Sequence, residues 1–193
     1  MDRTIKQTRS LQTELKTRAE GDGQEMFIEG YFAVFSRETE LWPGAFEEIA
    51  PGSFDATMGN DIRALINHDT TLVLGRNKSG TLELKTDSHG LWGRVEINPN
   101  DSDAINLYER VKRGDVSNCS FGFNITSENT DWRDDSSVKW TITGIDLWEV
   151  SVCTFPAYED TGVQARKAEV SQYKKRQFEL RKNQLKERLK KDA

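Results

Sequence analysis

The sequence is short of the residues that a disulfide framework or a metal site would need, and it has no long apolar run. Only two cysteines and two histidines occur among 193 residues, and the mean hydropathy is -0.72. Cys119 and Cys153 both lie in apolar runs typical of strands, which favours reduced thiols in an intracellular protein. No run reaches the length of a membrane span, and the N-terminal residues lack the apolar segment of a signal peptide. We therefore expect a protein made in the cytoplasm that has no membrane partner.

The sequence also lacks the motifs of nucleotide and metal chemistry. It has no glycine-rich phosphate-binding loop, and basic residues do not alternate with aromatic ones as they do in proteins that stack on bases. His68, Asp69, Asp87 and His89 are the only set that could gather around a metal, and their spacing matches no established ligand pattern. We therefore expect no metal, no cofactor and no specific nucleic-acid partner.

Charge is unevenly distributed along the chain. Residues 165–193 contain 11 basic and 4 acidic residues, a charge of +7, whereas residues 1–164 contain 16 basic and 28 acidic residues, a charge of -12. An acidic body argues against nucleic-acid binding by the body itself. The basic tail is free of glycine and proline and has only a loose apolar stripe, which predicts a marginal helix that either seeks an acidic partner or stays solvated.

Most of the body is predicted to form strands. Residues 1–25 are charged and poor in large apolar groups, so we expect a flexible leader there, and the two Pro-Gly pairs within residues 42–54 predict a structured loop. Dense or alternating apolar residues predict strands at residues 26–36, at 62–68, at 82–97 as a hairpin, at 114–125, and at 138–155 as two strands or one bent at Gly144.

One helix is predicted inside this β structure. Between Asp101 and Arg113 the apolar residues fall at helical spacing, with a capping residue before them and Gly114 after them. The predicted fold is therefore mainly β with flanking helices (α+β), a mostly antiparallel barrel or sandwich with at least one packed helix. A chain of this length is expected to build one domain of this kind.

The segment GDVSNCSFGFNI, residues 114–125, has two chemically different faces. One face carries Cys119, Phe121, Phe123 and Ile125, and the other is small and polar, with the Ser120 hydroxyl beside Gly122. The polar face is either a wet outer surface or the floor of a site.

A serine nucleophile needs a base, which is usually oriented by a third polar group. His68 ends an apolar strand in INHD, whereas His89 lies in the turn DSHG, so His68 is the better candidate base. Glu149 interrupts the apolar run LWEVSVCTF and would need a partner if buried. Taken singly, each of these residues is better explained as structural: a hydrogen-bonded histidine, a small packed serine and an edge-strand carboxylate.

Taken together, the segments resemble the prohead protease family of tailed bacteriophages, serine peptidases that mature phage capsids and are distantly similar to assemblin, the herpesvirus maturation protease. The resemblance spans about residues 28–166, and its motifs occur in the order of that family: GYFAVFS, EEIAPGSF, ALINHD, VLGR, SGTLELKTDSHGL, RGDVSNCSFGF and LWEVSVCTFPAYEDT, followed by Arg166.

The resemblance implies a catalytic triad. The histidine of the NHD motif is His68, the nucleophile of the SFGF motif is Ser120, and the acidic residue of the EVS motif is Glu149. We expect Gly122 to leave room for the substrate backbone. The sequence departs from the family pattern at Ser53, Asn118, Cys119 and Val152, and none of these is a proposed triad member.

The resemblance also implies an assemblin-like β-barrel, a protease domain over residues 26–166, and substrates comprising the scaffolding part of the major capsid protein and the protease itself. Cleavage would take place in the host cytoplasm, inside the assembling procapsid. A homodimer is an option, since assemblin-type enzymes are switched on by dimerisation. The basic tail, residues 167–193, would dock on acidic scaffold and be removed by self-cleavage. The alternative is a scaffold or assembly factor that keeps the fold and does not cleave.

Overall fold

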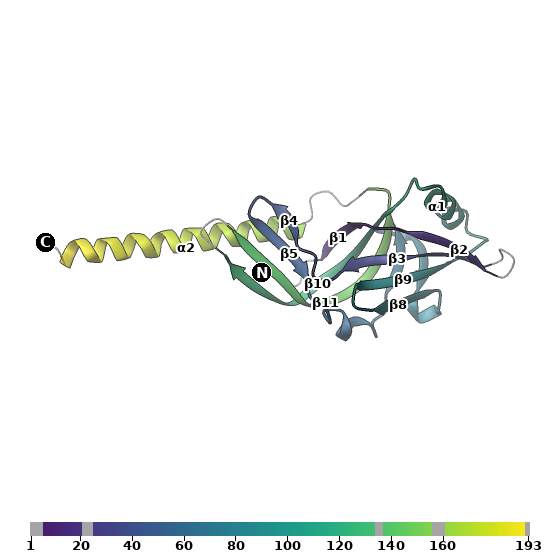
Figure 1. The fold of residues 1–193 in the computed structure, drawn as a ribbon, viewed down its shortest axis with the longest axis horizontal. Helices are drawn as coiled ribbons and strands as arrows, with labels where there is room; N and C mark the ends of the chain where they lie inside the picture. The colour runs from purple at the N-terminus through teal and green to yellow at the C-terminus, as the bar shows by residue number, and fades with distance from the viewer. Residues whose placement is uncertain (1–5, 21–24, 134–136, 156–160, 192–193) are drawn as a thin grey trace.

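The computed structural model describes residues 6–20, 25–133, 137–155 and 161–191, and its strands form two sheets (Figure 1). The larger sheet contains β1 (Gln7–Gln12), β4 (Thr39–Trp42), β5 (Ala45–Ile49), β6 (Arg63–Ile66), β7 (Asp69–Arg76), β10 (Asn118–Trp132) and β11 (Val138–Cys153). The smaller sheet contains β2 (Lys16–Glu20), β3 (Glu25–Val34), β8 (Leu82–Thr86) and β9 (Gly90–Ile97). The two α-helices are α1 (Ser102–Arg113) and α2 (Thr161–Lys191).

Strand β11 organises the larger sheet. Along one edge it pairs antiparallel with β10 over almost its whole length. Along the other edge it pairs in parallel with two short strands, β5 near its start and β6 near its end. The segment of β11 between Glu149 and Val152 therefore lies between β10 and β6, and the β6–β7 hairpin follows directly.

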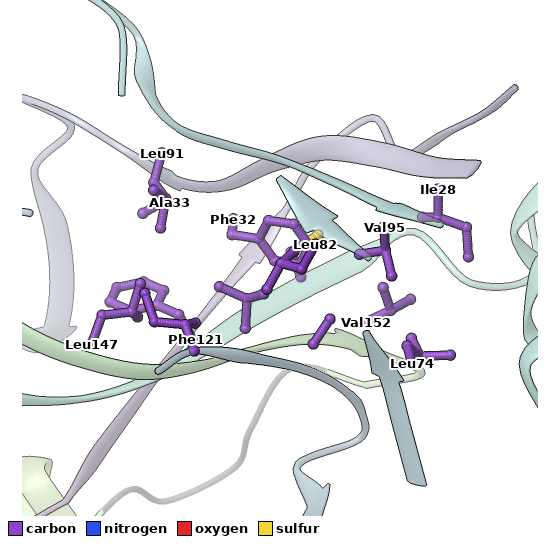
Figure 2. Packing of buried hydrophobic residues seen from close by; sticks show 14 of the residues in the cluster. Ile28, Phe32, Ala33, Leu74, Leu82, Leu91, Val95, Phe121, Leu147 and Val152 are labelled. Atoms are coloured by element: carbon purple, nitrogen blue, oxygen red, sulfur yellow. The ribbon is translucent and has the colours of Figure 1, made fainter. Parts of the chain in front are cut away.

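The hydrophobic core lies between the two sheets. Figure 2 shows Leu91 and Ala33 of the smaller sheet on the side of Phe121 and Leu147 of the larger one, and Val95 on the side of Val152 and Leu74. The apolar face predicted for residues 114–125 belongs to this core, because Cys119, Phe121, Phe123 and Ile125 are all buried. The opposite face of β10 is not a wet surface at this point, since Ser120 is completely buried.

The mainly β fold with a packed helix is confirmed. Helix α1 begins after Asp101, whose side chain accepts hydrogen bonds from the backbone of Asp103 and Ala104, and ends at Gly114 in the left-handed conformation (φ 89°). The predicted barrel, however, is not closed, because the strands form two separate sheets. Two of the β11 pairings are also parallel, so the larger sheet is mixed.

Two stretches differ from the sequence-based expectation. The region expected to be a flexible leader contains β1 and β2, which pair with β10 and β3. The expected loop at residues 42–54 contains β5. Strands β1 and β5 pair with β10 and β11, which lie far away in the sequence, whereas β2 pairs with the next strand, β3.

The stretch at 138–155, predicted as two strands or as one bent at Gly144, is one continuous strand opposite an irregularity of β10 near Gly144.

Helix α2 packs against the body near its start and then extends away from it (Figure 1). Arg166 is completely buried, and the Tyr173 ring stacks on Trp132 with ring centroids 3.6 Å apart. From residue 174 to 186 the side chains are exposed. The helix begins at Thr161, so the boundary expected between residues 166 and 167 falls inside it. Within the described residues, neither α1 nor α2 is apolar over a length that would cross a membrane.

Candidate active site

His68 lies in the two-residue turn that joins β6 to β7. Ile66 and Asp69 pair across this hairpin, and Asn67 and His68 both have positive φ values, 50° and 62°. Positive φ at both central residues is the pattern of a type I′ turn, which suits the twist of a hairpin. Asparagine tolerates this conformation well and histidine less so, so the turn needs support from outside.

That support comes from the last residues of β11 and from Thr154, which follows it. The Asn67 backbone N–H donates to the Val152 carbonyl at 3.1 Å, and the Asn67 side-chain oxygen accepts from the Thr154 N–H at 2.9 Å. The His68 backbone N–H donates to the Ser151 hydroxyl at 3.2 Å. These three hydrogen bonds fix the turn against β11 and bring the imidazole over the Glu149 carboxylate.

Glu149 and His68 form a close pair. His68 Nδ1 lies 2.7 Å from Glu149 Oε1, and Glu149 Oε2 accepts a hydrogen bond from the Ser151 hydroxyl at 2.6 Å. The Glu149 side chain is only 1% exposed, so both oxygens need such partners. Burial lowers the pKa of His68, but the adjacent Cys153 and Glu149 outweigh burial and raise the pKa to about 10. In this arrangement the imidazole holds its proton at neutral pH.

Gly122 makes room for this carboxylate. It pairs with Glu149 across β10 and β11, and a Cβ atom at this position would overlap Glu149 Oε1 and lie 2.9 Å from the Trp148 ring. The space above Gly122, which we expected to admit the substrate backbone, is therefore occupied by the Glu149 side chain.

Ser120 lies on the same face of the sheet, one strand away. It is the cross-strand partner of Ser151 on β11, and on its other side it pairs with Ser10 of β1. Its hydroxyl donates to the Arg9 carbonyl at 2.9 Å. His68 Nε2, the nitrogen that would accept a proton from a serine, is buried without a hydrogen-bond partner. Ser120 and Glu149 thus lie on neighbouring strands and His68 lies in the turn beside them, with the serine hydroxyl turned toward β1.

Comparison with known proteins finds a matching family model and similar phage proteins. The family model described as caudovirus prohead serine protease matches residues 13–176. The chain belongs to this family. The prohead protease of Enterobacteria phage HK97 is 32% identical over 161 residues, which cover 81% of this chain and 66% of that protein, just under two thirds of its length. The bacteriophage T4 capsid assembly protease, gp21, is 10% identical, with a TM-score of 0.44 over 76% of this chain and 98% of that one.

The prohead protease resemblance drawn from the motifs is therefore confirmed, and the other candidate residues can be placed. His89 lies in the β8–β9 turn of the smaller sheet, where its ring meets Tyr31 edge-on with centroids 4.4 Å apart. Asp87 accepts hydrogen bonds from Tyr31 and from the turn backbone. No group of three metal-binding side chains gathers in the part of the chain that the structure describes. Cys119 and Cys153 are free and buried.

Sequence reasoning missed three groups that contact the candidate residues: Asn67, Ser151 and the backbone of Arg9. For Ser151 a clue was available, because a residue two positions after Glu149 in a strand lies on the same face. For Asn67 the clue was the preference of asparagine for left-handed turn positions. Nothing in the sequence places Arg9 beside Ser120, since that contact depends on how β1 pairs with β10.

Proposed function

We propose that this protein is a serine endopeptidase with Ser120 as nucleophile, His68 as general base and acid, and Glu149 as the group that orients His68. The observation that carries the proposal is the 2.7 Å contact between His68 Nδ1 and a buried Glu149, on the strand next to Ser120. A carboxylate on Nδ1 leaves Nε2 as the nitrogen that exchanges a proton with the serine.

The reaction follows from these roles. Ser120 Oγ attacks the carbonyl carbon of the scissile peptide while its proton passes to His68 Nε2. The tetrahedral intermediate collapses when the leaving amine takes the proton from Nε2, which leaves an acyl ester on Ser120. Water then attacks the ester by the same route in reverse, and the serine is restored.

Two changes must precede this reaction in the described arrangement. The Ser120 hydroxyl has to leave the Arg9 carbonyl, and His68 has to lose a proton. Displacement of β1 by an incoming peptide would release the Ser120 hydroxyl. Loss of a proton from the imidazole would give the neutral base. The described state therefore corresponds to a resting enzyme.

We propose, from membership of the family, that the substrates are the scaffolding part of the major capsid protein and the protease itself, cleaved in the assembling procapsid in the host cell. The exposed part of α2 is suited to bind an acidic partner, because residues 174–186 carry six basic residues and one acidic one. A chain ending at Tyr173 keeps the packed start of α2. It is expected to enter proheads less efficiently than the full chain, and equal entry would contradict a docking role.

The second candidate is an assembly factor that does not cleave. The observation in its favour is the Ser120 hydroxyl, which is bound to Arg9 and not to His68.

Coexpression with the major capsid protein, read by intact mass, separates the two candidates. The wild type is expected to shorten the capsid protein and itself, and Ser120→Ala is expected to leave both whole. Ser127→Ala, on the same strand with its hydroxyl exposed near Thr143, is the matched control and should behave as the wild type. Equal masses for the wild type and Ser120→Ala would favour the assembly factor or a different nucleophile.

A further inference from the structure

We propose that Ser151 is a positioning residue of the active site: its hydroxyl holds the Glu149 carboxylate and the His68 backbone together, so that the imidazole is presented at the angle that catalysis needs. The proposal rests on the peptidase function proposed above, which assigns no role to Ser151.

The geometry places the Ser151 hydroxyl between the two other groups. It donates to Glu149 Oε2 at 2.6 Å and accepts from the His68 backbone N–H at 3.2 Å. His68 Nδ1 contacts the other carboxylate oxygen at 2.7 Å. The three residues therefore close a ring of hydrogen bonds, in which Glu149 is held at both oxygens and His68 at both its backbone and its side chain.

A hydroxyl is well suited to this position, because it donates one hydrogen bond and accepts others from the same atom. Ser151 is completely buried, so no solvent replaces a lost bond. Removal of the hydroxyl would leave Glu149 Oε2 and the His68 N–H without this partner. Each loss weakens a different constraint: the first lets the carboxylate rotate, and the second loosens the left-handed turn that carries the imidazole.

The position of Ser151 also links the ring to the nucleophile. Ser151 and Ser120 are direct partners across β11 and β10. The Ser120–Ser151 pair therefore sets the distance between β10, which carries Ser120, and the turn that carries His68. Ser151 is expected to contact no substrate, so its effect passes through His68 and Glu149.

The kinetic test uses Ser151→Ala and Ser151→Thr in the full chain, with cleavage of the capsid protein as the readout. For Ser151→Ala we expect kcat to fall about 10- to 100-fold with little change in KM, a range typical of groups that orient a catalytic ligand. Ser151→Thr keeps the hydroxyl and should recover part of the rate. Adding Ser151→Ala to Glu149→Gln should cost little more than Glu149→Gln alone, because both act through the same imidazole.

A second measurement does not depend on peptidase activity. The chain has only two histidines, so NMR titration in a Ser120→Ala, His89→Gln background reports His68 alone. With Ser151 present, the Nδ1 proton between His68 and Glu149 should give a downfield signal. In Ser151→Ala that signal should broaden or move upfield, and the His68 titration should move toward pH 6.5.

The two measurements have separate meanings. Unchanged kcat, or an unchanged His68 signal and titration in folded Ser151→Ala, would overturn the positioning role. A wild type that cleaves nothing, together with a His68 signal that depends on Ser151, would contradict the peptidase function and leave the positioning role intact.

Discussion

His68 adopts a backbone conformation that costs free energy for any residue with a Cβ atom. A non-glycine residue in the left-handed region is typically less stable by about 1–2 kcal/mol, and here two such residues follow each other. The hydrogen bonds from Asn67 and His68 to β11 offset this cost. The benefit is geometric, because a two-residue turn leaves the imidazole little freedom to move relative to Glu149.

The pKa of His68 predicts how activity depends on pH. A general base must be neutral, so the fraction of active enzyme should increase as the pH rises through the His68 pKa, which Cys153 and Glu149 raise to about 10 in the resting protein. Activity should therefore rise from pH 6.5 toward alkaline pH. Glu149→Gln removes the carboxylate, so this rise should move to lower pH by about one unit or more, while the maximal rate falls about 100- to 10,000-fold. Initial rates of peptide cleavage across pH test this, and an unmoved profile in Glu149→Gln would contradict it.

Substitution of Gly122 tests whether cleavage depends on the contact between the Glu149 carboxylate and His68. A Cβ at this position would overlap Glu149 Oε1, so Gly122→Ala should push the carboxylate away from His68 and reduce cleavage at least about 100-fold. The matched control is Gly59→Ala, where a Cβ meets no atom within 4 Å. Cleavage rates, with circular dichroism to verify folding, measure the effect. Full activity in Gly122→Ala would mean that the enzyme works without this contact.

At the residue scale the sequence indicated the candidate residues but not all of the contacts around them. Ser120, His68 and Glu149 could be chosen because each is a polar group in an apolar strand or at its end, and because the motifs around them match a family. Ser151 and Asn67 could not be assigned roles in advance. Their roles depend on the register between β10, β11 and the β6–β7 turn, which alternation along one strand does not determine.

Among the elements, β1 has the most direct effect on the site. It pairs with β10, the strand that carries Ser120, and the Arg9 carbonyl accepts a hydrogen bond from the Ser120 hydroxyl. The Arg9 side chain is fixed at the same time, since its Nη2 donates to Glu47 Oε2 on β5 at 2.9 Å. Strand β1 thus holds the serine in its resting orientation.

Loosening β1 should raise activity toward a peptide substrate. Arg9→Met removes the ion pair with Glu47, which still keeps Arg166 as a partner. We expect kcat/KM on a peptide to rise about 2- to 10-fold, corresponding to about 0.4–1.4 kcal/mol of relieved β1 pairing. Arg18→Met, which removes an exposed pair with Glu20 on β2, is the control. A lower rate in a folded Arg9→Met protein would show that β1 supports catalysis.

Elements with local signals were predicted, whereas β1 and β5, whose own sequences carry no strand pattern, were not. Helix α1 has its cap, its apolar spacing and its terminal glycine within one short segment. Strand β1 has the polar sequence QTRSLQ and forms because β10 offers it an edge. Strand β5 lies between turn residues and forms by parallel pairing with β11, far along the chain. Such pairings follow from the topology and not from local propensity.

At the scale of the whole molecule, the first strand and the start of the last helix meet at one buried carboxylate. Glu47 binds Arg9 of β1 and Arg166 of α2, and Arg166 also binds Glu128 at 2.8 Å and lies over the Trp140 ring. Burial raises the pKa of Glu47, but the two arginines outweigh burial and lower it. The carboxylate therefore stays charged and ties α2 to the sheet that carries the site.

The ion pair between Glu47 and Arg166 is expected to hold the start of α2 against the body. Arg166→Met should leave Glu47 with Arg9 alone and reduce the free energy of unfolding by about 3 kcal/mol, the usual cost of breaking a buried ion pair. Trypsin should then cleave α2 faster, because the start of the helix detaches more often. Arg176→Met, at an exposed position of α2, is the control. Thermal unfolding and the rate of proteolysis measure the effect, and equal values for the two variants would contradict the prediction.

The proposed catalytic groups come from β6–β7, β10 and β11, and His68 and Glu149 are 81 residues apart in the chain. No fragment of the chain that lacks one of these strands can present the site. A nascent or partly folded chain therefore cannot bring the three groups together until the larger sheet has formed around β11. For the peptidase proposed above, this order of folding would keep the other components of an assembling particle from premature digestion.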